Sequence, residues 1–146
     1  MTKTPDTRTV KLDISSRFDM LEVVQTVLGQ VAALGGFDDD AVHYMSVAVR
    51  ESVVNAIKHG NRLDESKRVD VVLDLQPDKL VVQIRDQGKG FDPGRVADPL
   101  APENLLKADG RGIFFMRSFM DEVSYSFPPQ GGTLVRMVKK RPHAAS

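Results

Sequence analysis

The chain has 146 residues, of which 41% are hydrophobic, and this size and composition suit one globular domain with a sizeable core. Its 20 basic and 20 acidic residues cancel, which argues against a broad electrostatic surface for nucleic acid or for an anionic membrane. The absence of cysteine excludes disulfides and thiolate metal sites. The sequence has no apolar run of membrane-spanning length and no signal-peptide core, so we expect a cytoplasmic protein.

The first predicted elements are a strand and a helix. Apolar and polar residues alternate over residues 10–14, which predicts a strand, and Ser15 or Ser16 can cap the helix that follows. Gly35 and Gly36 end this helix. Its buried stripe consists of apolar residues at helical spacing: Met20, Val24, Val27, Leu28 and Val31.

A second, longer helix is predicted from the acidic N-cap candidates at 38–40 to Gly60. Glu51, Asn55 and His59 are spaced four apart, so they share one face of a regular helix. An asparagine oxygen is a suitable ligand for Mg²⁺, and Glu51 is placed to take a proton from an attacking hydroxyl or water. His59 could orient the glutamate or contact phosphate. Each residue alone suits a solvated polar face, whereas the set favours chemistry.

Two alternating segments, 69–75 and 80–84, predict a hairpin with one buried face. Asp86 follows at the mouth of the second strand, and Gly88 and Gly90 come directly after it. Glycine permits positive φ and removes the Cβ atoms that would block a flat ring. A carboxylate beside such a slot can accept a hydrogen bond from an exocyclic amino group such as that of adenine.

Residues 91–109 are rich in proline and lack periodicity, which favours a lid over the site. Gly110 and Gly112 then flank Arg111 at the start of an apolar helix, where free backbone N–H groups form an anion site suited to phosphate. Arg111 either reaches phosphate as a bidentate donor or points into solvent. Strands are predicted at 123–127 and at 133–138.

Four segments resemble, in chain order, the conserved boxes of the histidine-kinase-like ATPase superfamily, and most resemble its RsbW-like branch of anti-sigma-factor serine/threonine protein kinases. They are E-S-V-V-N-A-I-K-H-G-N (51–61), D-Q-G-K-G-F-D-P (86–93), G-R-G-I-F-F-M-R-S-F-M-D-E-V (110–123) and G-G-T (131–133).

The resemblance implies an α+β fold of the Bergerat type. This is a two-layer α/β sandwich in which helices cover one face of a mixed sheet. We expect a single domain over residues 7–140, with flexible tails at 1–6 and 141–146.

The resemblance also implies ATP and Mg²⁺ as cofactors and a role for each matching residue. Asn55 is the expected magnesium ligand, Glu51 the catalytic base and Asp86 the adenine contact. The other expected nucleotide contacts are Lys58, His59, Gly88, Gly90, Gly110, Arg111, Gly112 and Thr133.

By the same resemblance, the protein phosphorylates a small anti-sigma-factor antagonist of the STAS type and sequesters a sigma factor by partner switching, as a homodimer. Neither direct nucleic-acid contact nor membrane attachment is expected. Two alternatives stay open. One is an ATP-binding regulatory module without significant kinase activity. The other is the catalytic domain of a sensor histidine kinase, against which no phospho-accepting histidine hairpin precedes the domain.

Overall fold

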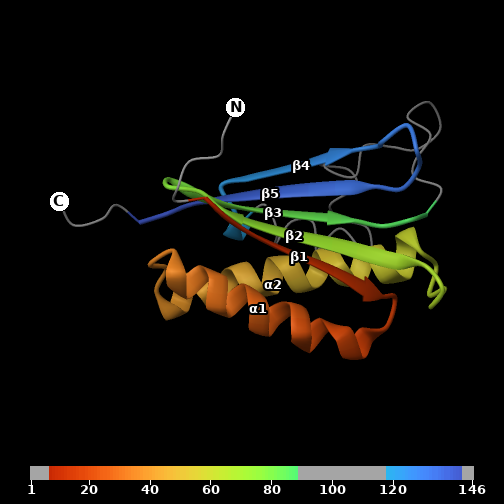
Figure 1. Ribbon diagram of the computed structural model, residues 1–146, viewed down its shortest axis with the longest axis horizontal. Coiled ribbons are helices and arrows are strands. Elements are labelled where there is room, and N and C mark those ends of the chain that lie inside the picture. The colour runs from red at the N-terminus through yellow and green to blue at the C-terminus, as the bar shows by residue number, and fades with distance from the viewer. Residues whose placement is uncertain (1–6, 89–117, 143–146) are drawn as a thin grey trace.

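The computed structural model describes residues 7–88 and 118–142 and shows a five-stranded sheet with two long helices packed against one face (Figure 1). This arrangement confirms the α+β fold class expected from the sequence. Between and beside these elements lie two short helical turns, η1 (Phe18–Met20) and η2 (Ala56–Gly60). The main elements are β1 (Arg8–Ser15), α1 (Leu21–Leu34), α2 (Asp39–Asn55), β2 (Arg68–Leu75), β3 (Lys79–Arg85), β4 (Glu122–Ser126) and β5 (Leu134–Lys140).

The strands lie in the order β1-β2-β3-β5-β4, and every pairing between the described strands is antiparallel. The expectation of a mixed sheet was therefore wrong. Two helices separate β1 from β2, so the chain runs along the sheet twice more and enters β2 in the direction opposite to β1 (Figure 1). The tight β2–β3 turn reverses the chain again, which keeps the ladder antiparallel.

The core lies between the sheet and the helices, as the alternating patterns predicted. The inward residues of β2 and β3 are buried, and so are Val24, Leu28 and Val31 of α1. Burial of this apolar area is the main stabilising contribution to such a two-layer fold. Val81 and Val138 pair across β3 and β5 and are also buried. By strand alternation they point to the face of the sheet opposite the core residues Val82 and Met137.

The start of α1 differs from the prediction, whereas its end matches it. The Ser16 hydroxyl donates to the carbonyl oxygen of Lys67, at 2.7 Å, and Arg17 holds the position before η1, so the capping role given to Ser15 or Ser16 was wrong. At the other end, the Gly36 N–H donates to the Ala33 carbonyl at 3.1 Å, and Gly36 has a φ of +81°. Glycine adopts this left-handed conformation without steric cost.

Helix α2 begins as predicted and changes form near its end. The Asp38 carboxylate accepts a hydrogen bond from the Ala41 N–H at 2.8 Å, which confirms an N-cap in the acidic run. From Ala56 the chain forms the wider π turn of η2, and the Asn61 N–H donates to the Ala56 carbonyl at 2.8 Å. Such turns are frequent at functional sites. Because the turn is wider than an α-turn, the four-residue spacing does not continue to His59.

The C-terminal end of β5 is tied to the end of the sheet that lies opposite Asp86. The Arg141 guanidinium donates to the carbonyl oxygens of Gly35 and Gln76, both at 3.0 Å, and its N–H donates to the Asp78 carbonyl at 2.9 Å. Specific contacts thus continue one residue past the expected boundary at 140. Residues 1–6 and 143–146 lie outside the described residues.

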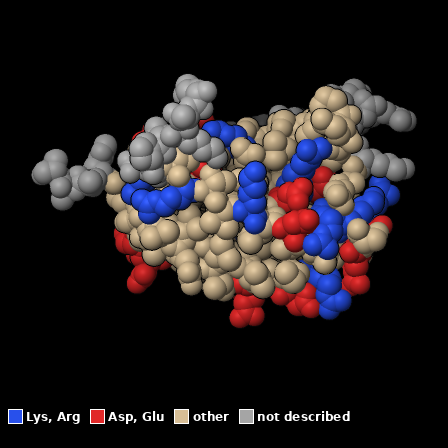
Figure 2. All heavy atoms as spheres, viewed as in Figure 1, with Lys and Arg blue, Asp and Glu red and all other residues tan. Residues whose placement is uncertain are grey.

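On the face seen in Figure 2, basic and acidic side chains are interspersed, without a field of one sign. None of the helices within the described ranges is both long and apolar enough to cross a bilayer.

Candidate nucleotide-binding site

Asp86 is the centre of a compact polar junction at the end of the sheet. It follows β3, and its N–H donates to the carbonyl oxygen of Thr133, just before β5, at 3.1 Å. Its Oδ1 atom accepts hydrogen bonds from the N–H groups of Gly88, at 2.9 Å, and of Thr133, at 3.1 Å. The residue is only 5% exposed. Two backbone donors and the neighbouring strand therefore fix the orientation of this carboxylate.

Three glycines pack against Asp86 so closely that a side chain would not fit. A Cβ atom at Gly60 would overlap the Asp86 carboxylate, one at Gly88 would overlap the Gly60 carbonyl, and one at Gly132 would overlap the Asp86 carbonyl. Gly132 also has a φ of +84°. The end of η2, the loop after β3 and the turn before β5 therefore meet here because each has glycine at the contact.

Burial raises the pKa of Asp86 above its ordinary value. The hydrogen bonds from Gly88 and Thr133, and the positive charges of Lys67 and Arg85, offset only part of this effect. The carboxylate is therefore held in a place where its charge is incompletely compensated. A ligand that brings one more hydrogen-bond donor, such as an aromatic amino group, would supply what is missing.

Glu51 and Asn55 lie one turn apart on α2, and both are partly buried. Asn55 is the last residue of α2, directly before the turn that carries Gly60 to Asp86. Its amide oxygen is a hard ligand of the kind that Mg²⁺ accepts, and Mg²⁺ commonly takes one or two protein ligands together with phosphate oxygens. Among the described residues there is no group of three or more His, Cys, Asp or Glu side chains suited to a metal.

The remaining predicted residues divide into two groups. Lys58 and His59 lie on η2 and are exposed, unlike the buried Asp86. Gly90, Gly110, Arg111 and Gly112 lie outside the residues that the structure describes, as does the expected lid. The structure thus brings Gly88, Thr133 and Asp86 together, and it places Glu51 and Asn55 on the helix that leads to them.

The sequence matches the histidine kinase-like ATPase domain family over residues 14–139, a range that contains both long helices, β2, β3 and β4, and all but the last residue of β5. The chain belongs to this family. Known proteins similar to this ATPase domain include several named serine-protein kinase RsbW. The protein from Oceanobacillus iheyensis is 25% identical over 136 residues, covering 89% of this chain and 85% of the relative. That from Staphylococcus epidermidis is 27% identical over 146 residues, covering 95% and 89%.

A solved structure shows the same fold. The ATPase domain superposes with a TM-score of 0.66 and 17% identity on the crystal structure of the RsbU and RsbW domains of Rv1364c from Mycobacterium tuberculosis. The match covers 92% of this chain and 33% of that one, so the domain spans about a third of the larger protein.

Sequence reasoning missed two residues that interact with parts of the candidate site. Asn61 is fully buried and bonds several segments around the junction, although its only sequence signal is its place at the end of the H-G-N triplet. Tyr125 lies on β4, and burial together with the nearby Glu51 charge raises its pKa to about 12. The inward position of Tyr125 was predictable from its alternation with Val123. Its interaction with Glu51 was not predictable, because Glu51 is distant in the sequence.

Proposed function

We propose that this histidine kinase-like ATPase is a protein serine/threonine kinase that transfers the γ-phosphoryl group of Mg-ATP to an anti-sigma-factor antagonist. The observation that carries the proposal is the buried Asp86 carboxylate, enclosed by Gly60, Gly88 and Gly132 at the end of the helix that bears Glu51 and Asn55. Supporting it, the domain belongs to an ATPase family, and its relatives from several bacteria are named serine-protein kinases.

The buried junction serves the adenine end of the nucleotide. Asp86 accepts a hydrogen bond from the exocyclic amino group, while the Gly88 and Thr133 N–H groups keep its other oxygen occupied. Absence of side chains at the three glycines lets these backbone segments pack directly against Asp86 and against one another, which holds the carboxylate in place. This arrangement favours adenine over a base that carries a carbonyl oxygen in place of the amino group.

The transfer step assigns distinct tasks to Glu51 and Asn55. Glu51 accepts the proton of the substrate serine hydroxyl, whose oxygen forms a bond to the γ-phosphorus while the bond to the bridging oxygen breaks and ADP leaves. Asn55 would hold the magnesium ion through its amide oxygen, and the ion would supply neutralisation of the charge on the phosphate oxygens. Burial and the charge of Glu51 raise the pKa of Tyr125, so its hydroxyl stays protonated and does not compete with Glu51 as the base.

The partners proposed for the kinase are a STAS-type antagonist, which it phosphorylates, and a sigma factor, which it sequesters when the antagonist is released. Exchange between them follows nucleotide state and phosphorylation, because a ligand shifts a partner equilibrium only through its different affinity for the two states. A homodimer in the cytoplasm completes the proposal.

The test is capture of partners by the full chain from its native cell extract, with and without Mg-ATP, followed by mapping of phosphorylated residues on the captured proteins. We expect phosphoserine or phosphothreonine on a small antagonist, together with a sigma factor that binds when the antagonist is phosphorylated. Capture of the same proteins without phosphate would favour a binding module, and phosphohistidine would favour a sensor-kinase domain.

A further inference from the structure

Asn61 is a fully buried polar residue that has no part in the proposed transfer chemistry. Its Nδ2 atom donates to the Ser16 hydroxyl at 2.8 Å and to the Arg68 carbonyl at 2.9 Å. Its Oδ1 atom accepts from the Gln87 N–H at 2.7 Å. Both Nδ2 hydrogens and the amide oxygen are therefore used. Buried amides with complete hydrogen bonding are rigid, because any movement leaves a polar group unpaired.

The three partners of this side chain belong to three neighbouring strands. Ser16 directly follows β1, Arg68 is the first residue of β2, and Gln87 comes just after β3. The backbone N–H of Asn61 adds a fourth bond, to the Ala56 carbonyl at the start of η2. Asn61 thus joins the turn that follows α2 to the end of the sheet where Asp86 lies.

The position of Asn61 relative to Asp86 is what links it to the nucleotide site. Gln87, whose N–H the side chain holds, directly follows Asp86 in the chain. Gly60, which packs against the Asp86 carboxylate, directly precedes Asn61. The same residue therefore fixes the chain on both sides of the contact between Gly60 and Asp86. A small shift of either segment would alter the direction in which the carboxylate faces.

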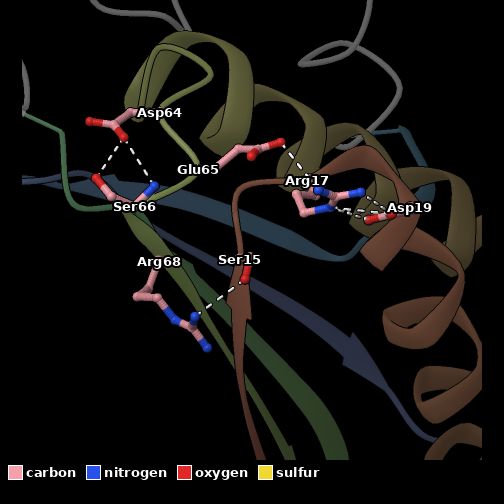
Figure 3. Close-up of polar contacts among 7 residues, drawn as sticks. All are labelled: Ser15, Arg17, Asp19, Asp64, Glu65, Ser66 and Arg68. Carbon is pink, nitrogen blue, oxygen red and sulfur yellow. Dashed lines mark hydrogen bonds and ion pairs between the residues drawn. The ribbon is translucent and has the colours of Figure 1, made fainter.

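The surface contacts of the same loops cannot supply this rigidity. Arg17, between β1 and η1, contacts Asp19 at 2.8 Å and Glu65 at 3.4 Å (Figure 3), and all three side chains are more than half exposed. Exposed ion pairs of this kind add little rigidity, because solvent screens the charges and both long side chains stay mobile. The buried amide therefore holds these loops together with the bond from the Arg68 N–H to the Gln87 Oε1 atom, at 2.6 Å, and it is the side chain that reaches all three segments.

We propose that Asn61 is a positioning residue for adenine recognition, which sets the spacing between Gly60 and Asp86 and thereby the selectivity for an amino-bearing base. The inference rests on the proposed function, because it requires ATP at Asp86.

The test compares Asn61→Ala with the matched control Ser16→Ala, using calorimetric titration of each full-length variant with Mg-ATP and Mg-ITP. ITP carries a carbonyl oxygen where ATP carries the amino group. Asn61→Ala removes the bond to Gln87, and we expect ATP to bind at least about tenfold more weakly while ITP changes little, so the ATP-to-ITP affinity ratio falls. Ser16→Ala removes one acceptor of Nδ2 and the hydroxyl bond to the Lys67 carbonyl, but it keeps the bond between Asn61 and Gln87, so that ratio should stay within about twofold. Loss of stability alone does not change the ratio.

An unchanged ratio in Asn61→Ala, or an equal fall in both variants, overturns the inference. If Asn61→Ala does not fold, amide hydrogen exchange of Gln87 in the unaltered protein decides instead. We expect saturating Mg-ATP to slow this exchange at least about threefold more than saturating Mg-ITP, and equal slowing overturns the inference. Failure of the unaltered protein to bind ATP contradicts the proposed function itself, and the titration separates that result from a loss confined to the variant.

Discussion

Glu51 is the residue on which the proposed proton transfer depends. Replacement by alanine should leave nucleotide affinity nearly unchanged and slow phosphoryl transfer by about 100-fold or more, the usual effect of losing a general base. Single-turnover transfer from labelled ATP to the antagonist measures the rate, and calorimetry measures affinity. Glu22→Ala, an exposed substitution on α1, is the matched control. Full activity in Glu51→Ala would remove the assignment.

Asp86 combines a proposed binding role with an unfavourable effect on stability. Burial raises the pKa of Asp86, so the folded protein binds this proton more tightly than the unfolded chain does. The stability that the protonated side chain contributes is complete below the unfolded pKa of about 3.9 and is lost as the pH rises through the folded pKa. Asp86→Asn lacks this titration. We therefore expect urea unfolding to show the variant gaining stability relative to the unaltered protein as the pH rises above the unfolded pKa of about 3.9.

The same Asp86→Asn variant should bind ATP much more weakly and ITP little differently. The carboxylate accepts hydrogen bonds from the Gly88 and Thr133 N–H groups with one oxygen and, as proposed, from the adenine amino group with the other, whereas an amide has one oxygen only. A variant that loses stability as pH rises, relative to the unaltered protein, would contradict the effect of burial. Equal weakening of both nucleotides would contradict the contact with adenine.

At the scale of elements, the meeting of η2 with the loop after β3 depends on Gly60. Gly60→Ala places a methyl group on the Asp86 carboxylate, so we expect a loss of at least about 1–3 kcal/mol in unfolding free energy and strong weakening of ATP binding. Gly29→Ala is the control, because Gly29 lies inside α1 with open space around it and should stabilise the helix by about 0.5–1 kcal/mol. Thermal unfolding and calorimetry distinguish the two variants.

Much of the arrangement of elements was predictable from local patterns. Alternation in β2 and β3, the apolar stripe of α1 and the acidic cap of α2 each reflect interactions within a few residues. The π turn after Asn55 was not predictable. It is closed by the bond from the Asn61 N–H to the Ala56 carbonyl, and Asn61 is in turn bonded to segments that are distant in the sequence. For the same reason, Ser16 was misread as a cap: its partner Lys67 is distant in sequence.

At the scale of the whole molecule, Arg141 joins the C-terminus to the end of α1 and to the β2–β3 turn. Arg141→Ala should lower the unfolding free energy by about 1–2 kcal/mol, since charged hydrogen bonds to backbone carbonyls are lost. Nucleotide affinity should stay unchanged, because these contacts lie at the other end of the sheet. Urea denaturation checks the prediction against Lys140→Ala, an exposed neighbour, and equal stability of both variants would contradict it.

The site itself was predictable in its parts but not in its assembly. The glycine and carboxylate motifs identified Asp86, Gly88 and Thr133, and the structure brings these three together. The packing of Gly60 against Asp86, the bond of Asn61 to Gln87 and the interaction of Tyr125 with Glu51 all join residues separated by at least one strand. Such long-range contacts leave no periodic signal in a single sequence.

Gly60, Asp86 and Thr133 come from three distant parts of the chain and meet only when it is folded. The denatured chain therefore does not bind the nucleotide. Binding to the folded state alone stabilises it by an amount that grows with the logarithm of the ratio of nucleotide concentration to dissociation constant, and the melting temperature rises accordingly. At a hundredfold excess over the dissociation constant, this linkage amounts to about 2.7 kcal/mol. Thermal unfolding with a panel of purine nucleotides can therefore rank their affinities for this protein before any partner protein has been isolated.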